Sequence, residues 1–188
     1  MKNKRRNQIP PFLHLWRIIG AQIFTRVFGI WPMNLIANLL PLSNILLDTQ
    51  VTSKKRVFEQ AGLVFENNQG VARSKVFDSL FARERLGSTG LGQHVAVPHG
   101  RIKGLRAPVA ALVRVQDPIP FDAPDGHPVK LLIFLLVPEN ANQHHLDILS
   151  ELAQMLSDKE FRENLMTQTD PSAMHQLITN WEPYQPAS

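Results

Sequence analysis

The sequence predicts a single α/β sandwich, and three observations support this fold class. The segment Val129–Pro138 (VKLLIFLLVP) is almost wholly apolar, which is typical of a central strand buried on both faces. Segments with helical periodicity occur on both sides of it along the chain, mixed with shorter strand-like runs. Hydrophobic residues make up 44% and charged residues 19% of the 188 residues, a composition typical of a globular domain with a buried core.

The N-terminal part of this domain is predicted to contain an irregular lead-in and two helices. Residues 34–52 alternate only weakly between apolar and polar positions, so no regular element is expected there. Ser53 is a candidate N-cap for a helix that continues to about Glu66. The spacing of apolar residues predicts a second helix from Ala72 to Arg85. The apolar positions on these helices are Val57, Phe58, Ala61, Val76, Phe77, Leu80 and Phe81.

Short strands follow the second helix. The glycine-rich segment Gly87–Gly92 (GSTGLG) predicts a turn that ends the helix. Val95–Val97 and Val109–Val115 have the composition of strands. The proline-rich segment Pro118–Pro128 (PIPFDAPDGHP) is expected to be a loop that leads into the central apolar strand.

Helices are predicted for the C-terminal part. The first runs from about His144 to Ser157, and Asp158 can cap a short one that ends near Leu165. The dipeptide Asp170-Pro171 indicates the start of a last helix, which ends near Asn180. The residues of the first of these helices expected to point inward are Leu146, Leu149, Leu152 and Leu156.

The net charge of +4 is unevenly distributed. Residues 1–32 hold six basic residues and no acidic one, whereas the remainder holds fourteen basic and sixteen acidic residues, hence a net charge of −2. A nucleic-acid-binding domain needs a basic stripe on its folded body. The composition therefore argues against a nucleic-acid partner.

The basic N-terminal segment has two interpretations. Arg17 and Arg26 make a membrane-spanning helix costly, but Phe12–Trp31 is amphipathic enough to lie on a membrane surface. Alternatively, native translation begins at Met33, and residues 1–32 are an extension without function. The expected division is thus a basic extension, 1–32, and one domain, 33–188.

Cysteine is absent from the sequence, which excludes disulfides and thiolate zinc sites and weakly favours a reducing cytoplasm. The seven histidines do not match the HExxH spacing of a zinc site. His94 and His99 are expected to face opposite sides of a strand. We therefore expect no metal site.

The stretch VAVPHGR places His99 where a predicted strand ends. Pro98 fixes the direction in which the chain leaves the strand. Gly100 lacks a Cβ, so a bulky group is expected to approach the imidazole closely. A neutral imidazole nitrogen is a nucleophile at pH 7, and with an arginine nearby it can accept a phosphoryl group.

Other polar candidates lie at the ends of predicted elements, and each has a purely structural alternative. Arg83 in the last turn of its helix could bind an anion or belong to an ordinary solvated face. Ser88, Thr89 and the amides of Gly87–Gly92 could form an anion-binding concavity or simply stop the helix. His144 and His145 begin a helix and could be functional or merely exposed.

Four segments together resemble the nitrogen-regulatory enzyme IIA proteins of the phosphoenolpyruvate-dependent phosphotransferase system, which are related to its mannitol/fructose-type IIA domains. The resemblance runs from about Met33 to the C-terminus. The segments are SKKR (Ser53–Arg56), RERLGSTGLGQHVAVPHGRIKGL (Arg83–Leu105), PIPFDAPDGHPVKLLIFLLVP (Pro118–Pro138) and HLDILSELAQMLSD (His145–Asp158).

The resemblance implies a mixed β-sheet with helices on both faces. It implies that His99 is phosphorylated on Nε2, that Arg83 pairs with the phosphoryl oxygens and that His145 is a second active-site histidine. His94 and Asp147 depart from the residues usual in the family, at positions outside these three. The expected further phosphate contacts are Gly87, Ser88, Thr89, Gly90 and Gly100.

The resemblance also implies partners. A histidine phosphocarrier protein donates the phosphoryl group, and no bound metal or nucleotide cofactor is needed. The phosphorylation state is then read by transporters or sensor kinases in the cytoplasm. Two alternatives remain: a sugar-permease IIA component that passes phosphate to a IIB domain, and an interaction module that is never modified.

Overall fold

A mixed β-sheet lies at the centre of the protein, in a computed structural model that describes residues 34–140 and 143–182. The expectations for residues 1–32 lie outside this range. Within it, six strands form one sheet in the order β1-β5-β6-β3-β2, with β4 also paired to β6. The strands are β1 (Ile45–Thr49), β2 (Gly90–Gly92), β3 (Val95–Ala96), β4 (His99–Ile102), β5 (Val109–Ile119) and β6 (Val129–Pro138).

The central strand is β6, as its apolar sequence predicts. It pairs antiparallel with β5 along one edge, and parallel with both β3 and β4 along the other. Its side chains alternate between the two faces of the sheet, so successive apolar side chains enter one core and then the other. Leu132, Phe134 and Leu136 belong to one hydrophobic cluster, whereas Leu131, Ile133, Leu135 and Val137 belong to the second.

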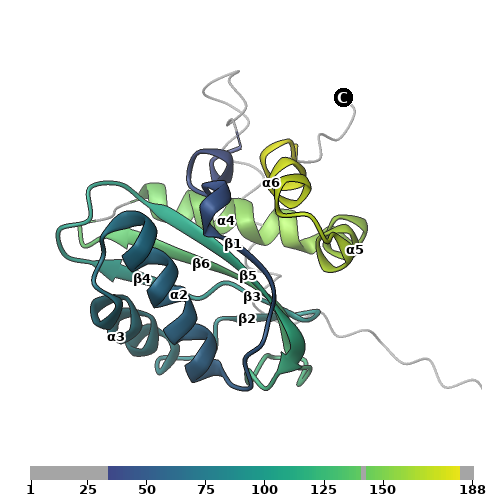
Figure 1. Ribbon diagram of the computed structural model, residues 1–188, viewed down its shortest axis with the longest axis horizontal. Coiled ribbons are helices and arrows are strands. Elements are labelled where there is room, and N and C mark those ends of the chain that lie inside the picture. The colour runs from purple at the N-terminus through teal and green to yellow at the C-terminus, as the bar shows by residue number, and fades with distance from the viewer. Residues whose placement is uncertain (1–33, 141–142, 183–188) are drawn as a thin grey trace, which may run out of the picture. The chain divides into compact units, whose positions relative to one another are not determined.

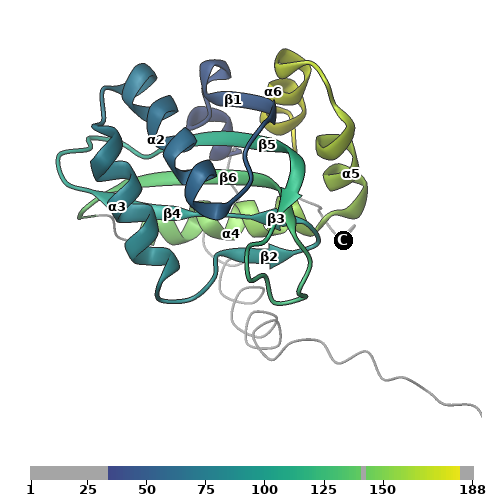
Figure 2. The same cartoon turned by 60° about the horizontal axis from the view of Figure 1, so that its bottom comes forward.

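Helices cover both faces of the sheet (Figures 1 and 2). One face is covered by α2 (Lys54–Gln69) and α3 (Arg73–Glu84). The other is covered by α4 (Gln143–Ser157), α5 (Lys159–Thr167) and α6 (Pro171–Thr179). The predicted α/β sandwich with a mixed sheet between helices is confirmed.

The predicted helix starts are confirmed by their caps. The Ser53 hydroxyl accepts a hydrogen bond from the Arg56 amide at 3.3 Å, and Asp158 accepts one from the Phe161 amide at 3.1 Å. Asp170 caps α6, and Pro171 is its first residue. These side chains accept from amides that have no carbonyl partner within their own helix.

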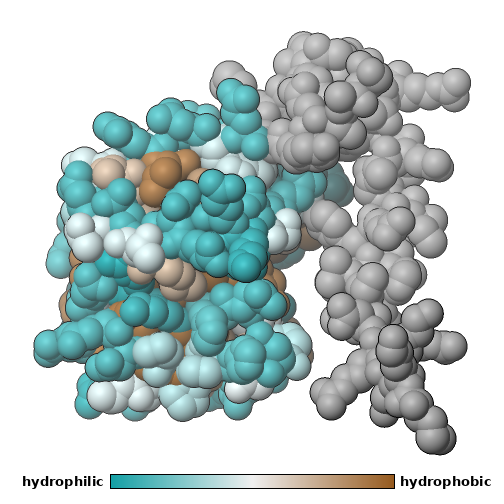
Figure 3. Space-filling model, turned by 90° about the vertical axis from the view of Figure 1, so that its right-hand side faces the viewer, coloured by the Kyte–Doolittle hydropathy of each residue, from teal (hydrophilic) through white to brown (hydrophobic). Residues whose placement is uncertain are grey.

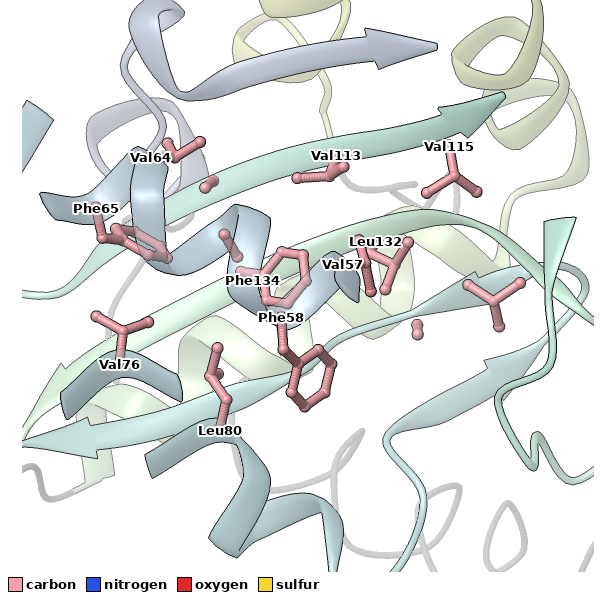
Figure 4. Close-up of a cluster of buried hydrophobic side chains, with 14 of the residues drawn as sticks. Val57, Phe58, Val64, Phe65, Val76, Leu80, Val113, Val115, Leu132 and Phe134 are labelled. Atoms are coloured by element: carbon pink, nitrogen blue, oxygen red, sulfur yellow. The ribbon is translucent and has the colours of Figure 1, made fainter. Parts of the chain in front are cut away.

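The core under α2 and α3 is rich in aromatic rings. Phe58 lies at its centre and makes edge-on contact with Phe134 of β6, with ring centroids 5.7 Å apart (Figure 4). It also contacts Phe81 of α3 and Phe121 of the β5–β6 loop, at 5.9 and 6.1 Å. One ring therefore joins two helices, the sheet and a loop.

Several predicted boundaries are wrong. Residues 34–52 contain the 3-10 helices η2 (Ile36–Asn38) and η3 (Leu42–Asn44), and then β1, which pairs with β5. Strand β5 extends to Ile119, into the predicted proline-rich loop. Helix α4 buries Ile148, Leu152 and Met155, whereas Leu146 is 50% exposed.

The surface is mainly polar where Figure 3 shows it, on the side that faces right in Figure 1. Hydrophobic side chains appear there in small patches between hydrophilic ones. Within the described ranges, no helix has both the length and the hydropathy that crossing a bilayer requires.

Candidate functional site

His99 lies at a break between two strands that share one neighbour. β3 pairs with Leu131 and Leu132 of β6, and β4 continues along the same strand from His99, opposite Leu135. The expectation that His99 opens into a loop is therefore wrong, because it is the first residue of β4. Pro98 in the break is buried, and its carbonyl accepts a hydrogen bond from the Leu135 amide at 2.9 Å. The backbone that carries the imidazole is thus fixed on both sides.

Both nitrogens of the half-buried His99 ring have hydrogen-bond partners. Nδ1 lies 2.9 Å from the carbonyl oxygen of Val97, and Arg83 Nε donates to Nε2 at 3.0 Å. A carbonyl can only accept, so Nδ1 carries the proton. The lone pair of the neutral ring is therefore on Nε2 and faces the guanidinium.

The surroundings of His99 favour the neutral ring. Burial lowers the pKa of the imidazole, and the charges of Arg83 and His145 lower it further. The hydrogen bond to the Val97 carbonyl and the charge of Glu84 act in the opposite direction without reversing the result. The Nε2 nitrogen is thus unprotonated at neutral pH, and its lone pair accepts the hydrogen bond from Arg83 Nε.

Close packing of α3 against β4 brings Arg83 to the ring. Gly100 is buried, and a Cβ there would overlap the Ser79 hydroxyl and lie 3.2 Å from the Ser79 carbonyl carbon. Ser79 donates to the Arg101 carbonyl at 2.8 Å, which joins the helix to the strand. The space beside Gly100 is therefore filled by α3, and the expectation that it admits an external group is wrong.

Glu84, the residue after Arg83, belongs to a second set of polar and charged side chains. We call Lys54, Glu84, Thr89 and Asp122 the Glu84 network. Lys54 Nζ contacts Glu84 at 2.8 Å and Asp122 at 2.9 Å, and it lies over the Phe121 ring at 4.4 Å from the centroid. Burial on its own lowers the pKa of Lys54, but the hydrogen bonds to these two carboxylates outweigh it and raise that pKa.

The glycine turn after α3 satisfies most of its own donors. The amide and hydroxyl of Thr89 both donate to Glu84 Oε2, at 3.0 and 2.6 Å. The Ser88 hydroxyl donates to the Phe121 carbonyl at 2.8 Å and accepts from the Gly90 amide at 3.2 Å. The Gly87 amide donates to the Glu84 carbonyl. These groups support the turn internally, and the expectation that they also contact a phosphoryl group stays a prediction.

Helix α4 brings the second predicted histidine to the site. His145 lies in its first turn, is half-buried, and is close enough for its charge to act on the pKa of His99. His144 is exposed. Arg83 of α3 and His99 of β4 are thus in direct contact, and His145 of α4 is near enough to affect the pKa of His99.

The sequence prediction does not include Glu84, which lies between Arg83 and Arg85 in a charged stretch. Its side chain is only 6% exposed. A signal for this burial exists, since Val76, Leu80 and Glu84 follow one another at intervals of four and form the buried row of α3. A carboxylate that continues an apolar row at helical spacing indicates a buried, paired charge.

Two further histidines of the described residues pair with each other instead. His94 and His127 stack on each other at 5.3 Å, between the β2–β3 turn and the β5–β6 loop. Among the residues that the structure describes, no three histidine or acidic side chains are arranged to hold a metal ion.

Comparison with known proteins identifies relatives that match most of this chain. The family model described as "Phosphoenolpyruvate-dependent sugar phosphotransferase system, EIIA 2" matches residues 38–181. A protein of Pseudomonas aeruginosa named "Nitrogen regulatory protein" is 42% identical over 129 residues, which is 68% of this chain and 84% of that protein. One of the same name from Klebsiella oxytoca is 36% identical over 148 residues, 74% of this chain and 91% of its own.

Solved structures share the fold. The crystal structure of nitrogen regulatory protein IIA-Ntr from Neisseria meningitidis superimposes with a TM-score of 0.74 at 52% identity, covering 77% of this chain and 99% of its own. The IIA mannitol structure from Escherichia coli has a TM-score of 0.63 at 23% identity, over 73% and 97% of the two chains. The second likeness concerns the fold alone.

Proposed function

Because the chain belongs to the EIIA 2 family of the phosphoenolpyruvate-dependent sugar phosphotransferase system, we propose that it is a regulatory protein that accepts a phosphoryl group on His99. The donor is a phosphorylated histidine carrier protein. Transporters or sensor kinases read the phosphorylation state in the cytoplasm, a location consistent with the absence of cysteine. The domain that does this is residues 33–188, and the family match over residues 38–181 supports that boundary.

One observation carries this proposal: the Nε2 lone pair of a neutral His99 faces a guanidinium, and Nδ1–H is held by a backbone carbonyl. The ring is thereby fixed as the tautomer that attacks through Nε2. A nucleophile needs such a fixed tautomer, and a developing phosphoryl anion needs a cation beside it.

The transfer conserves atoms and charge without an added cofactor. The Nε2 lone pair forms a bond to phosphorus while the bond between phosphorus and the donor's imidazole nitrogen breaks. The donor ring, protonated on its other nitrogen, keeps that electron pair and leaves as neutral imidazole. His99 keeps its proton on Nδ1 and takes over the positive charge of the ring. Phosphoryl transfer depends mainly on alignment and charge neutralisation, so the protein supplies both through fixed side chains.

Arg83 moves only a short way in this step. Its Nε–H occupies the lone pair before transfer, at 3.0 Å, and the guanidinium then donates to the oxygens on phosphorus. His145, whose charge already acts on His99, contributes a further donor.

The names of the relatives support the regulatory assignment, since proteins with 42% and 36% identity are named nitrogen regulatory proteins. A fructose-specific EIIA component of Haloferax volcanii is 33% identical over 132 residues. Transfer of phosphate to a IIB domain is therefore the second function to test.

The test is incubation with phosphoenolpyruvate, the first enzyme of the system and its histidine carrier, followed by mass measurement of the intact protein. We expect an acid-labile, base-stable gain of one phosphate in the wild type, none in His99→Ala, and a normal gain in the control His94→Ala. A wild type without gain, or a His99→Ala variant that gains, contradicts the proposal. Rapid loss of the phosphate to an added IIB domain would favour the sugar-transport alternative.

A further inference from the structure

Both hydrogen bonds on the His99 ring depend on the turn that follows α3. The Val97 carbonyl accepts from Nδ1, and the Val97 amide in turn donates to the Thr89 carbonyl at 3.0 Å. Arg83 Nε donates to Nε2, and Arg83 Nη1 donates to the Gly87 carbonyl at 2.9 Å. The two carbonyls that orient the site therefore come from residues of one turn.

Glu84 holds this turn closed. Its Oε2 accepts both the amide and the hydroxyl of Thr89, so the five-residue segment after α3 is fastened back onto the last residue of the helix. Its Oε1 accepts from Lys54, whose ammonium is itself paired with Asp122. A carboxylate that is only 6% exposed thus has charged or hydrogen-bonding partners on both oxygens.

We propose that Glu84 is a positioning residue for phosphoryl transfer: through Thr89 and Gly87 it sets the direction of the Arg83 guanidinium and of the His99 ring. The guanidinium is planar, so fixing Nη1 on the Gly87 carbonyl also fixes where Nε–H points. Glu84 touches neither the phosphoryl group nor the reacting nitrogen. The kinetic consequence of this role rests on the proposed function, whereas its geometric consequence does not.

Glutamine cannot replace Glu84 in this network. If its amide oxygen faces Thr89, its NH₂ group meets the Lys54 ammonium, and two donors oppose each other. If the amide oxygen instead faces Lys54, the NH₂ group meets the Thr89 amide N–H, which is also a donor. Glu84→Gln therefore keeps the size of the side chain and breaks one half of the network in either orientation.

Four variants test the proposal. Glu84→Gln disturbs the network at either Lys54 or Thr89, and Thr89→Val removes the hydroxyl bond to Glu84 while the amide bond stays, whereas Thr89→Ser keeps both Thr89 donors. The control Glu59→Gln removes a carboxylate from an exposed ion pair with Arg56 on α2. Thr89→Val tests the same link without changing a charge, so the proposal stays testable if Glu84→Gln does not fold.

Two measurements are made on each folded variant. The first is the ¹⁵N–¹⁵N coupling across the hydrogen bond between Arg83 Nε and His99 Nε2, measured by NMR on the unphosphorylated protein. The second is kcat/KM for phosphoryl acceptance from the histidine carrier. A residue that merely stabilises the fold would leave both unchanged in protein that is fully folded.

We expect the full coupling in the wild type, Thr89→Ser and Glu59→Gln, and a weaker coupling in Glu84→Gln and Thr89→Val. The rate should fall about tenfold to a hundredfold in Glu84→Gln and about tenfold in Thr89→Val, and stay within about twofold in the other two. The positioning role is overturned if the coupling is missing in the wild type, or if coupling and rate do not fall together. If the wild type accepts no phosphate, the proposed function fails, while the coupling still decides whether Glu84 orients Arg83.

Discussion

Two clusters of buried charge stabilise this protein, and only one of them touches the candidate site. The Glu84 network lies at the end of α3, beside Arg83 and His99. The Arg114 cluster lies where β1, β5 and α5 meet: the guanidinium pairs with both oxygens of Asp48, at 3.0 and 2.9 Å, and donates to the carbonyls of Leu165, Met166 and Gln168 at the end of α5. The Arg114 side chain is only 2% exposed.

The two clusters differ in the groups that their charged side chains bind. Arg114 satisfies carbonyls that the end of a helix leaves unpaired, so its partners are all structural. Glu84 satisfies the donors of a turn whose carbonyls bind the Arg83 guanidinium and the Val97 amide, and the Val97 carbonyl in turn holds the His99 ring. Burying a charge destabilises the fold unless the charge has all its partners. Here a buried, paired charge stabilises the fold in the Arg114 cluster, whereas in the Glu84 network it also aligns Arg83 and His99.

The largest expected effect is a loss of stability when the Arg114 cluster is broken, without a change in the phosphorylation rate. Arg114→Met leaves the α5 carbonyls and Asp48 without their cation, and we expect a loss of about 3 kcal/mol in the free energy of unfolding. Urea denaturation measures it. The phosphorylation rate per folded molecule should stay at the wild-type value; a rate that falls in fully folded protein would mean that the clusters are not separate.

Arg83→Ala tests the candidate site. It should lower the phosphorylation rate strongly and the stability only slightly, the opposite of Arg114→Met. Its guanidinium is half-buried and bonds to His99 and the Gly87 carbonyl, so the stability loss should be small. The rate of phosphoryl acceptance should fall about a hundredfold or more, the usual effect of removing a preorganised donor to a developing anion. Arg85→Ala, two residues further and exposed, is the matched control. Equal rates in the two variants would remove Arg83 from the site.

Gly100→Ala should lower both the stability and the rate of phosphoryl acceptance. The added methyl group overlaps Ser79 and pushes α3 away from β4, which costs about 1–3 kcal/mol and shifts Arg83 relative to His99. In a double-mutant cycle with Ser79→Ala, the double variant should be less destabilised than the sum of the two single variants. Simple additivity would show that the close contact does not set the position of the helix.

The smallest effect is the pH dependence of stability. The pKa of His99 is lower in the folded protein than the usual value of about 6.5, so below that pH the unfolded chain binds a proton that the native ring does not. The contribution of His99 to stability is therefore intact above pH 6.5 and declines as the pH falls below it. Comparing urea midpoints of the wild type and His99→Gln between pH 8 and 5 isolates this contribution. A wild type that gains stability relative to the variant as the pH falls would contradict it.

The sequence predicts the parts of this architecture that depend on local pattern. The apolar run Val129–Pro138, the Ser53 and Asp158 caps and the Asp170-Pro171 start are all found at the expected residues. Arg83 and His99 lie sixteen residues apart in the chain, yet their hydrogen bond follows from packing of α3 against β4, which the motif alone does not describe.

The missed features depend on contacts between distant segments. β1 has a weak pattern of its own, and it is a strand because β5 pairs with it. β4 is too short to be predicted, and it exists because it continues along β6 after Pro98. Gly100 suggested room for an external group, whereas the space is taken by Ser79 of α3. Such tertiary pairing overrides local propensity.

The central claim is that Nε2 of His99 is the accepting atom while Nδ1 keeps its proton. The direct measurement is ³¹P–¹⁵N correlation on the phosphorylated protein labelled with ¹⁵N-histidine. The account predicts that phosphorus couples to Nε2 of His99 alone, and that Nδ1 remains protonated on the Val97 carbonyl. Phosphorus coupled to Nδ1, or to the nitrogen of any other histidine, would contradict it.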